Sequence, residues 1–82
     1  MTDAAALEGM VAALARGLVD NPDQVRVERS DDGDATVLSL YVAEEDLGQV
    51  IGRGGRIARA LRQVLRAGAT ASGQRVTLEI VD

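Results

Sequence analysis

The residues best suited to chemistry lie at positions 50–57, which read Val-Ile-Gly-Arg-Gly-Gly-Arg-Ile and contain a Gly-x-x-Gly motif. Glycine adopts positive φ angles and lets a ligand approach the backbone without a Cβ in the way. A glycine turn before a helix also leaves unpaired N–H groups at the positive end of the helix dipole. These features favour binding of an anion such as phosphate, with Arg53 at the tip as a charged partner.

The Gly-x-x-Gly pattern is weakly specific by itself. A chain with nine glycines in 82 residues is expected to contain about one such pair by chance. The alternative interpretation is therefore a plain hinge between two helices. The aliphatic residues Val50, Ile51 and Ile57 on either side of the motif, and the arginines that follow it, favour a binding loop.

The distribution of charge also favours an anionic ligand, although the net charge is −4 and the sequence pI is about 4.6. No Asp or Glu occurs from Leu47 to Leu78. Salt screens charges beyond about 8 Å, so a local basic region affects an approaching anion more than the net charge does. This acid-free segment carries Arg53, Arg56, Arg59, Arg62, Arg66 and Arg75.

The composition excludes most catalytic and metal-binding chemistry. The chain has no Cys, no His and no Lys, which excludes disulfides, thiolate and imidazole metal sites, Ser-His and Cys-His nucleophile pairs and Schiff-base lysines. We therefore expect no enzymatic activity and no cofactor. An enzyme or metal site on Asp31, Asp32 and Asp34 is a weak alternative, because this spacing lacks the full ligand series of an EF-hand.

The first half of the chain is expected to form a helix and a hairpin. Asp3 can cap a helix that runs to about Val19. The alternating residues 25–29 and 36–43, with the turn residues 31–34 between them, predict an antiparallel hairpin. The apolar spacing of the helix predicts a buried stripe of Leu7, Met10, Val11, Leu14 and Leu18.

The second half is expected to place the motif between two helices, which completes the order α-β-β-α-α-β. Acidic residues 44–46 suit the N-terminus of a short helix. A longer helix resumes near Gly55 and ends at about Ala67, residues 68–73 form a loop, and residues 76–80 form a strand. On the longer helix, a basic face of Arg56, Arg59, Arg62 and Arg66 is expected opposite a packed face of Ile57, Leu61, Val64, Leu65 and Gly68.

Residues 50–57 in this setting resemble the signature loop of KH domains, in which Gly-x-x-Gly clamps about four nucleotides. The element order resembles the type II arrangement, and residues 51–62 resemble the small bacterial single-KH proteins of the KhpA family. The resemblance covers the whole chain. It implies an α+β type II KH fold, with one domain over residues 1–82 and a three-stranded sheet covered on one face by three helices.

The resemblance also implies a function. It implies a cytoplasmic, non-catalytic protein that binds single-stranded RNA as a post-transcriptional regulator or RNA chaperone, a role linked in some bacteria to cell elongation and division. The implied partners are a second copy of the chain or a larger KH protein of the KhpB (Jag-like) type, with no membrane association. The alternative is a protein-interaction module whose main role is dimerisation. The residues expected to bind RNA are Ile51, Gly52, Arg53, Gly54, Gly55, Arg56, Ile57, Arg59 and Arg62.

An aliphatic groove is expected beside the loop. Val50, Ile51 and Ile57 would form its floor, and Leu40 or Val42 would line its other wall. Tyr41 is the only aromatic residue, so extensive stacking of bases on aromatic side chains is excluded. Gly54 stands where the KH family usually has Lys or another polar residue, which predicts modest affinity.

Overall fold

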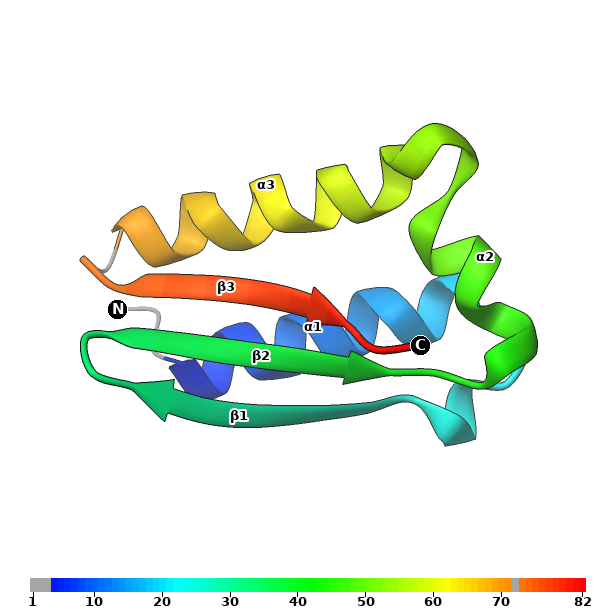
Figure 1. Ribbon diagram of the computed structural model, residues 1–82, viewed down its shortest axis with the longest axis horizontal. Coiled ribbons are helices and arrows are strands. Elements are labelled where there is room, and N and C mark those ends of the chain that lie inside the picture. The colour runs from blue at the N-terminus through cyan, green and yellow to red at the C-terminus, as the bar shows by residue number, and fades with distance from the viewer. Residues whose placement is uncertain (1–3, 72) are drawn as a thin grey trace.

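A three-stranded sheet and the helices packed on it make up the fold (Figure 1). The computed structural model describes residues 4–71 and 73–82, so the predicted helix cap Asp3 lies outside the described residues. The order α-β-β-α-α-β is confirmed, with short 3-10 turns at Pro22–Gln24, Glu44–Asp46 and Arg53–Gly55. The main elements are α1 (Ala4–Leu18), β1 (Arg26–Asp32), β2 (Ala35–Tyr41), α2 (Leu47–Ile51), α3 (Arg56–Ala71) and β3 (Arg75–Ile80).

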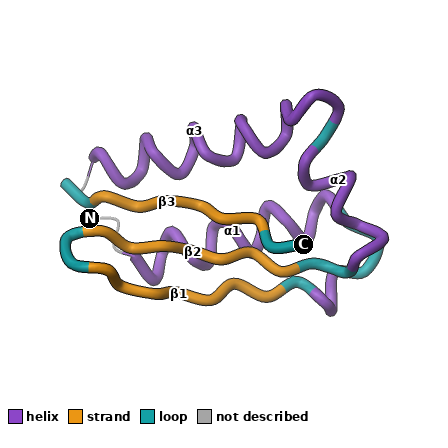
Figure 2. Tube along the Cα trace, in the orientation of Figure 1, coloured by secondary structure: helices purple, strands orange, loops and turns teal. Residues whose placement is uncertain are grey.

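The sheet is mixed and has β2 in its centre (Figure 2). Strand β1 pairs antiparallel with β2 through the predicted hairpin, and β3 pairs parallel with β2 after the crossover through α2 and α3. Leu38 and Leu78 are register partners and both are buried, whereas Glu79, the next residue along β3, is exposed. Alternation of this kind places the helices on one face of the sheet. The fold is therefore the expected α+β arrangement.

The buried stripes of α1 and α3 differ in part from the prediction. Leu14 and Val64 were expected in the core, but they are 40% and 47% exposed. Alanines take the inward positions, and their small side chains let the helices pack closely on the sheet and on each other. The fully buried large apolar side chains are Leu7, Val11, Leu38, Leu40, Val50 and Leu65, and the buried alanines of α1 and α3 are Ala15, Ala58 and Ala69.

The end of α3 was predicted too early. The helix continues to Ala71 through most of the expected loop. Gly68 lies against α1, where a Cβ on it would come within 2.8 Å of Leu7 Cδ2, and this close packing holds the last turns of the helix in place. The helix ends as the backbone N–H groups of Gly73 and Gln74 donate to the carbonyl oxygens of Thr70 and Ala69. Gly73 has a φ of +72°, which is typical of a glycine helix end.

The acidic segment before α2 was expected to interact with the N-terminus of that helix. It lies there, but the Asp46 side chain makes no capping bond to α2. Its carboxylate is buried and accepts hydrogen bonds from the connection that follows α1, at Asp20 and Asn21. This contact ties the start of α2 to the end of α1.

The remaining structural expectations concern membranes and metals. Within the described part of the chain, no helix is long and apolar enough to cross a bilayer. The carboxylate of Asp31 accepts a hydrogen bond from Thr36 Oγ1 at 3.1 Å across the hairpin. The side chain of Asp32 lies outside the described part of the structure. Within that part, no three His, Cys, Asp or Glu side chains are grouped so that they could hold a metal ion.

Candidate nucleic-acid interface

Residues 52–55, called the glycine corner below, turn the chain from α2 into α3 (Figure 1). The N–H of Gly52 donates to Gly48 O at 2.8 Å and so closes α2. Gly52, Gly54 and Gly55 have φ angles of +76°, +65° and +78°. Residues with a Cβ rarely adopt such angles, so the shape of the corner depends on these three glycines.

The glycines of the corner have different surroundings. A Cβ on Gly52 would lie 2.9 Å from the backbone nitrogen of Ile57 and would overlap the Ile57 side chain. A Cβ on Gly54 would meet nothing within 4 Å. Gly52 is therefore required by packing inside the fold, whereas Gly54 leaves open space at the surface of the corner.

Two backbone N–H groups of the corner have no hydrogen-bond acceptor among the described residues. The N–H of Gly55 donates to Gly52 O at 3.1 Å, and the N–H of Arg56 donates to Arg53 O. Within the described part of the chain, no hydrogen bond uses the N–H of Arg53 or of Gly54, and both residues are exposed. Two successive free N–H groups at a turn of this kind can donate together to one anion.

The arginines near the corner fall into two groups. Arg59 Nη2 donates to Gly54 O at 2.6 Å, and Arg62 Nε donates to Leu78 O on β3 at 3.4 Å. The side chains of Arg53, Arg56 and Arg66 are exposed and form no hydrogen bond or ion pair with another described residue. On the basic face predicted on α3, Arg59 and Arg62 are therefore bonded to the backbone, whereas Arg56 and Arg66 are available to a ligand.

The predicted aliphatic groove is only partly accessible. Ile51 is 38% exposed at the end of α2, and Ile57 is half-buried beneath Gly52. Val50 and Leu40 have no exposed surface, so the prediction that they line a groove is wrong. Val50 points inward because the five-residue helix α2 packs with that side on the core.

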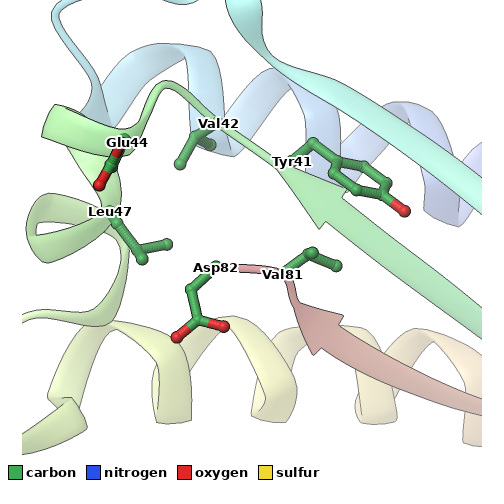
Figure 3. A pocket seen from close by; sticks show the side chains of 6 residues that line it. All are labelled: Tyr41, Val42, Glu44, Leu47, Val81 and Asp82. Atoms are coloured by element: carbon green, nitrogen blue, oxygen red, sulfur yellow. The ribbon is translucent and has the colours of Figure 1, made fainter.

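A hollow of about 860 Å³ lies between the start of α2 and the ends of β2 and β3 (Figure 3). Val42 was predicted to line the groove beside the glycine loop, but it lines this separate hollow, to which neither Ile51 nor Ile57 contributes. Leu47 and Val81 line it too and were missed, because they come from segments far apart in the sequence. Its six lining residues are Tyr41, Val42, Glu44, Leu47, Val81 and Asp82.

A second, apolar groove of about 460 Å³, called the α1–α3 groove below, separates α1 from α3. It includes the exposed Leu14 and Val64, together with the predicted site residue Ile57. No charged side chain lines it among the described residues. The full lining is Ala13, Leu14, Gly17, Leu18, Ile57, Ala60, Leu61 and Val64.

Comparison with known proteins relates the chain to one family. Residues 8–80 match the family model described as KhpA/KhpB, KH domain. The chain is 52% identical over 75 residues to the RNA-binding protein KhpA of Treponema pallidum, with 92% of this chain and 94% of the relative covered. It is 46% identical over 76 residues to that of Halalkalibacterium halodurans, with coverage of 93% and 100%. It is also 46% identical over 69 residues to that of Leifsonia xyli, with coverage of 84% and 88%.

Proposed function

The chain belongs to the KhpA/KhpB family of KH domains, and on this premise we propose that it binds single-stranded RNA at the glycine corner without catalysing a reaction. The domain that binds would span residues 1–82. The observation that carries the proposal is the pair of free N–H groups on Arg53 and Gly54, set in a segment without acidic residues. Relatives named RNA-binding protein KhpA support RNA as the source of the anion.

The mode of binding follows from the chemistry of the corner. The two N–H groups would donate to the non-bridging oxygens of one phosphate, and the absence of a side chain on Gly54 lets the RNA backbone come close. Arg53 at the tip and Arg56 at the start of α3 would pair with neighbouring phosphates. Ile51, exposed beside the corner, would contact a sugar or base. None of these contacts reads a base edge, so little sequence specificity is expected.

Because backbone contacts carry the binding, the affinity depends on salt. The logarithm of the association constant for single strands falls with the logarithm of salt concentration at a slope of about −0.7 per phosphate contacted. With about two to four contacts, a threefold rise in salt weakens binding by about five- to twentyfold.

The test is a charge-reversal variant, Arg53→Asp with Gly54→Asp, measured with a single-stranded RNA of about ten nucleotides. We expect loss of binding, because two carboxylates would repel the phosphate from the corner. The matched control is Arg29→Asp with Gly33→Asp. Gly33 has a φ of +64° and no atom within 4 Å of an added Cβ, as Gly54 does, and it lies in the β1–β2 turn at the other end of the molecule (Figure 1).

The control alters the net charge by the same amount but at the far end of the molecule. Salt screens charges at that distance, so the RNA affinity of the control is expected to stay within about threefold of the wild type. Circular dichroism and thermal melting would establish that both variants are folded. Unchanged affinity in the corner variant refutes the corner as the RNA site. Equal loss in both variants would show that net charge alone controls binding.

We further propose that a second copy of the chain covers the α1–α3 groove. The groove is uncharged, so it suits an apolar protein surface and not RNA. Leu14 on α1 and Val64 on α3 flank the groove. In a dimer with a two-fold axis, Leu14 of each copy would be buried against Val64 of the other copy. The small residues Ala13, Gly17 and Ala60 allow the helices to approach closely.

Sedimentation of the wild type and of Val64→Asp tests the dimer. Val64 is about half exposed, so the variant should fold and should sediment as a monomer. A monomeric wild type at concentrations up to about 100 μM would refute the homodimer. Copurification with a larger KH protein of the KhpB type would then identify a heterodimer. In that case we propose that the chain contributes to RNA regulation as part of the heterodimer.

A further inference from the structure

We propose that Arg59 is a positioning residue that holds the glycine corner in the shape that binds phosphate, and that it does not itself contact the RNA. This inference rests on the function proposed above. It differs from the expectation that Arg59 contacts the RNA directly. It concerns the side chain that donates a hydrogen bond of 2.6 Å to the carbonyl oxygen of Gly54.

The geometry places the Arg59 guanidinium against the corner. Its Nη2 donates to Gly54 O at 2.6 Å, and the same nitrogen would lie 3.7 Å from a Cβ on Gly55. Helical side chains point toward the N-terminus of their helix, so an arginine one turn into α3 reaches back to the turn that precedes it. A bond between a charged guanidinium and a carbonyl oxygen is stronger than a bond between neutral groups.

This bond fixes the peptide group that joins Gly54 to Gly55. Its carbonyl oxygen accepts from Arg59, and its N–H donates to Gly52 O at 3.1 Å. A peptide group held at both ends cannot rotate, although glycine on each side would otherwise allow many conformations. That N–H holds Gly52 O, which is the carbonyl oxygen of the peptide group that carries the free N–H of Arg53. This donor is therefore kept in one arrangement before the ligand arrives, which lowers the entropy lost on binding.

Arg56 provides a matched comparison for Arg59, because its side chain forms no hydrogen bond to the corner. Both are exposed arginines in the first turn and a half of α3, but Arg56 has no partner among the described residues. Removal of the Arg56 charge should remove a phosphate contact, whereas removal of the Arg59 side chain should loosen the corner. The conservative variant Arg59→Lys keeps the charge and a donor, so it should restore part of the effect.

The first experiment uses the free protein. Nuclear relaxation and amide exchange of Gly54 and Gly55 are compared in the wild type, Arg59→Gln, Arg59→Lys and Arg56→Gln. We expect greater motion of the corner in Arg59→Gln, partial recovery in Arg59→Lys and no change in Arg56→Gln. An equally ordered corner in Arg59→Gln overturns the proposal. This result does not depend on RNA, so it stands apart from any failure of the proposed function.

The second experiment measures affinity for a ten-nucleotide RNA at three salt concentrations. Arg59→Gln is expected to bind about five- to tenfold more weakly than the wild type, with the same salt slope. Arg56→Gln is expected to lower the magnitude of the slope by about 0.7, as one phosphate contact is lost. A slope reduced by about 0.7 in Arg59→Gln would overturn the proposal and make Arg59 a direct phosphate ligand. Absence of binding by the wild type would instead refute the proposed function.

Discussion

The two ends of helix α2 meet the rest of the chain in opposite ways. At its start, the buried carboxylate of Asp46 accepts hydrogen bonds from the backbone N–H groups of Asp20 and Asn21, at 3.3 and 3.0 Å, and from Asn21 Nδ2 at 3.0 Å. At its end, the glycine corner holds the N–H groups of Arg53 and Gly54, which have no acceptor among the described residues.

The donors at the two ends are of the same kind, since both are successive backbone N–H groups at a turn. At the first end the chain supplies its own anion and buries it. At the second end the neighbouring sequence supplies no carboxylate, because the acid-free segment begins at Leu47, directly after Asp46. Turns that require an anion can therefore be closed by a side chain or left for a ligand, and the placement of acidic residues determines which.

The largest expected effect concerns Gly52, the glycine of the corner that packing inside the fold requires. Gly52→Ala should lower the free energy of unfolding by about 3–5 kcal/mol, since it combines a positive φ with overlap of the new Cβ and Ile57. Urea denaturation followed by circular dichroism measures the change. A loss of less than about 1 kcal/mol would show that Ile57 moves aside easily.

The next effect concerns the anion that the chain supplies. Asp46→Ala should lower the free energy of unfolding by about 2–4 kcal/mol, because three donors lose a charged acceptor. Glu45→Ala is the matched control. Glu45 is exposed, and Asn21 Nδ2 is its one side-chain donor in the part of the chain that the structure describes, so we expect a loss of about 0.5 kcal/mol or less. Equal losses from the two variants would mean that the buried carboxylate does not hold α2 in place.

Sequence patterns predicted the elements and the position of the corner, because local propensity decides both. The glycine motif, the hairpin and the element order follow from spacing within short segments. The end of α3 was missed because Gly68 is stabilised by contact with Leu7 from a distant helix, and tertiary packing overrides the tendency of glycine to end helices.

The details of the candidate site were less predictable. Nothing in the spacing distinguishes Arg59, which bonds to Gly54 O, from Arg56, which has no partner, since both fall on the predicted basic face. The exposure of Val64 and the burial of Ala58 depend on how α3 is rotated against the sheet, and alanine and valine both fit an apolar stripe. Asp46 was read as a local helix signal, but its partners lie 25 and 26 residues earlier.

A smaller effect is expected at the open glycine of the corner. Gly54→Ala should cost about 1 kcal/mol of stability from its φ of +65° and should weaken RNA binding by about three- to tenfold, because the methyl group stands beside the free N–H groups. Gly33→Ala shares the angle and the empty surroundings, so it should cost the same stability and leave RNA affinity unchanged. If both variants bind RNA equally well, the open space at Gly54 does not serve the ligand.

The smallest effect tests α2 as the rigid link between the Asp46 contact at its start and the glycine corner at its end. Gly48 lies within α2, is exposed, and has no atom within 4 Å of an added Cβ, so Gly48→Ala should stabilise the fold by about 0.5–1 kcal/mol. Its carbonyl oxygen closes the helix by accepting from Gly52 N–H, and this bond does not involve a side chain. The RNA affinity should therefore stay the same while the midpoint of urea denaturation rises. A change in affinity without a change in stability would mean that α2 must flex for RNA to bind. The difference between the closed start of α2 and the open glycine corner would then depend on motion of the helix that joins them.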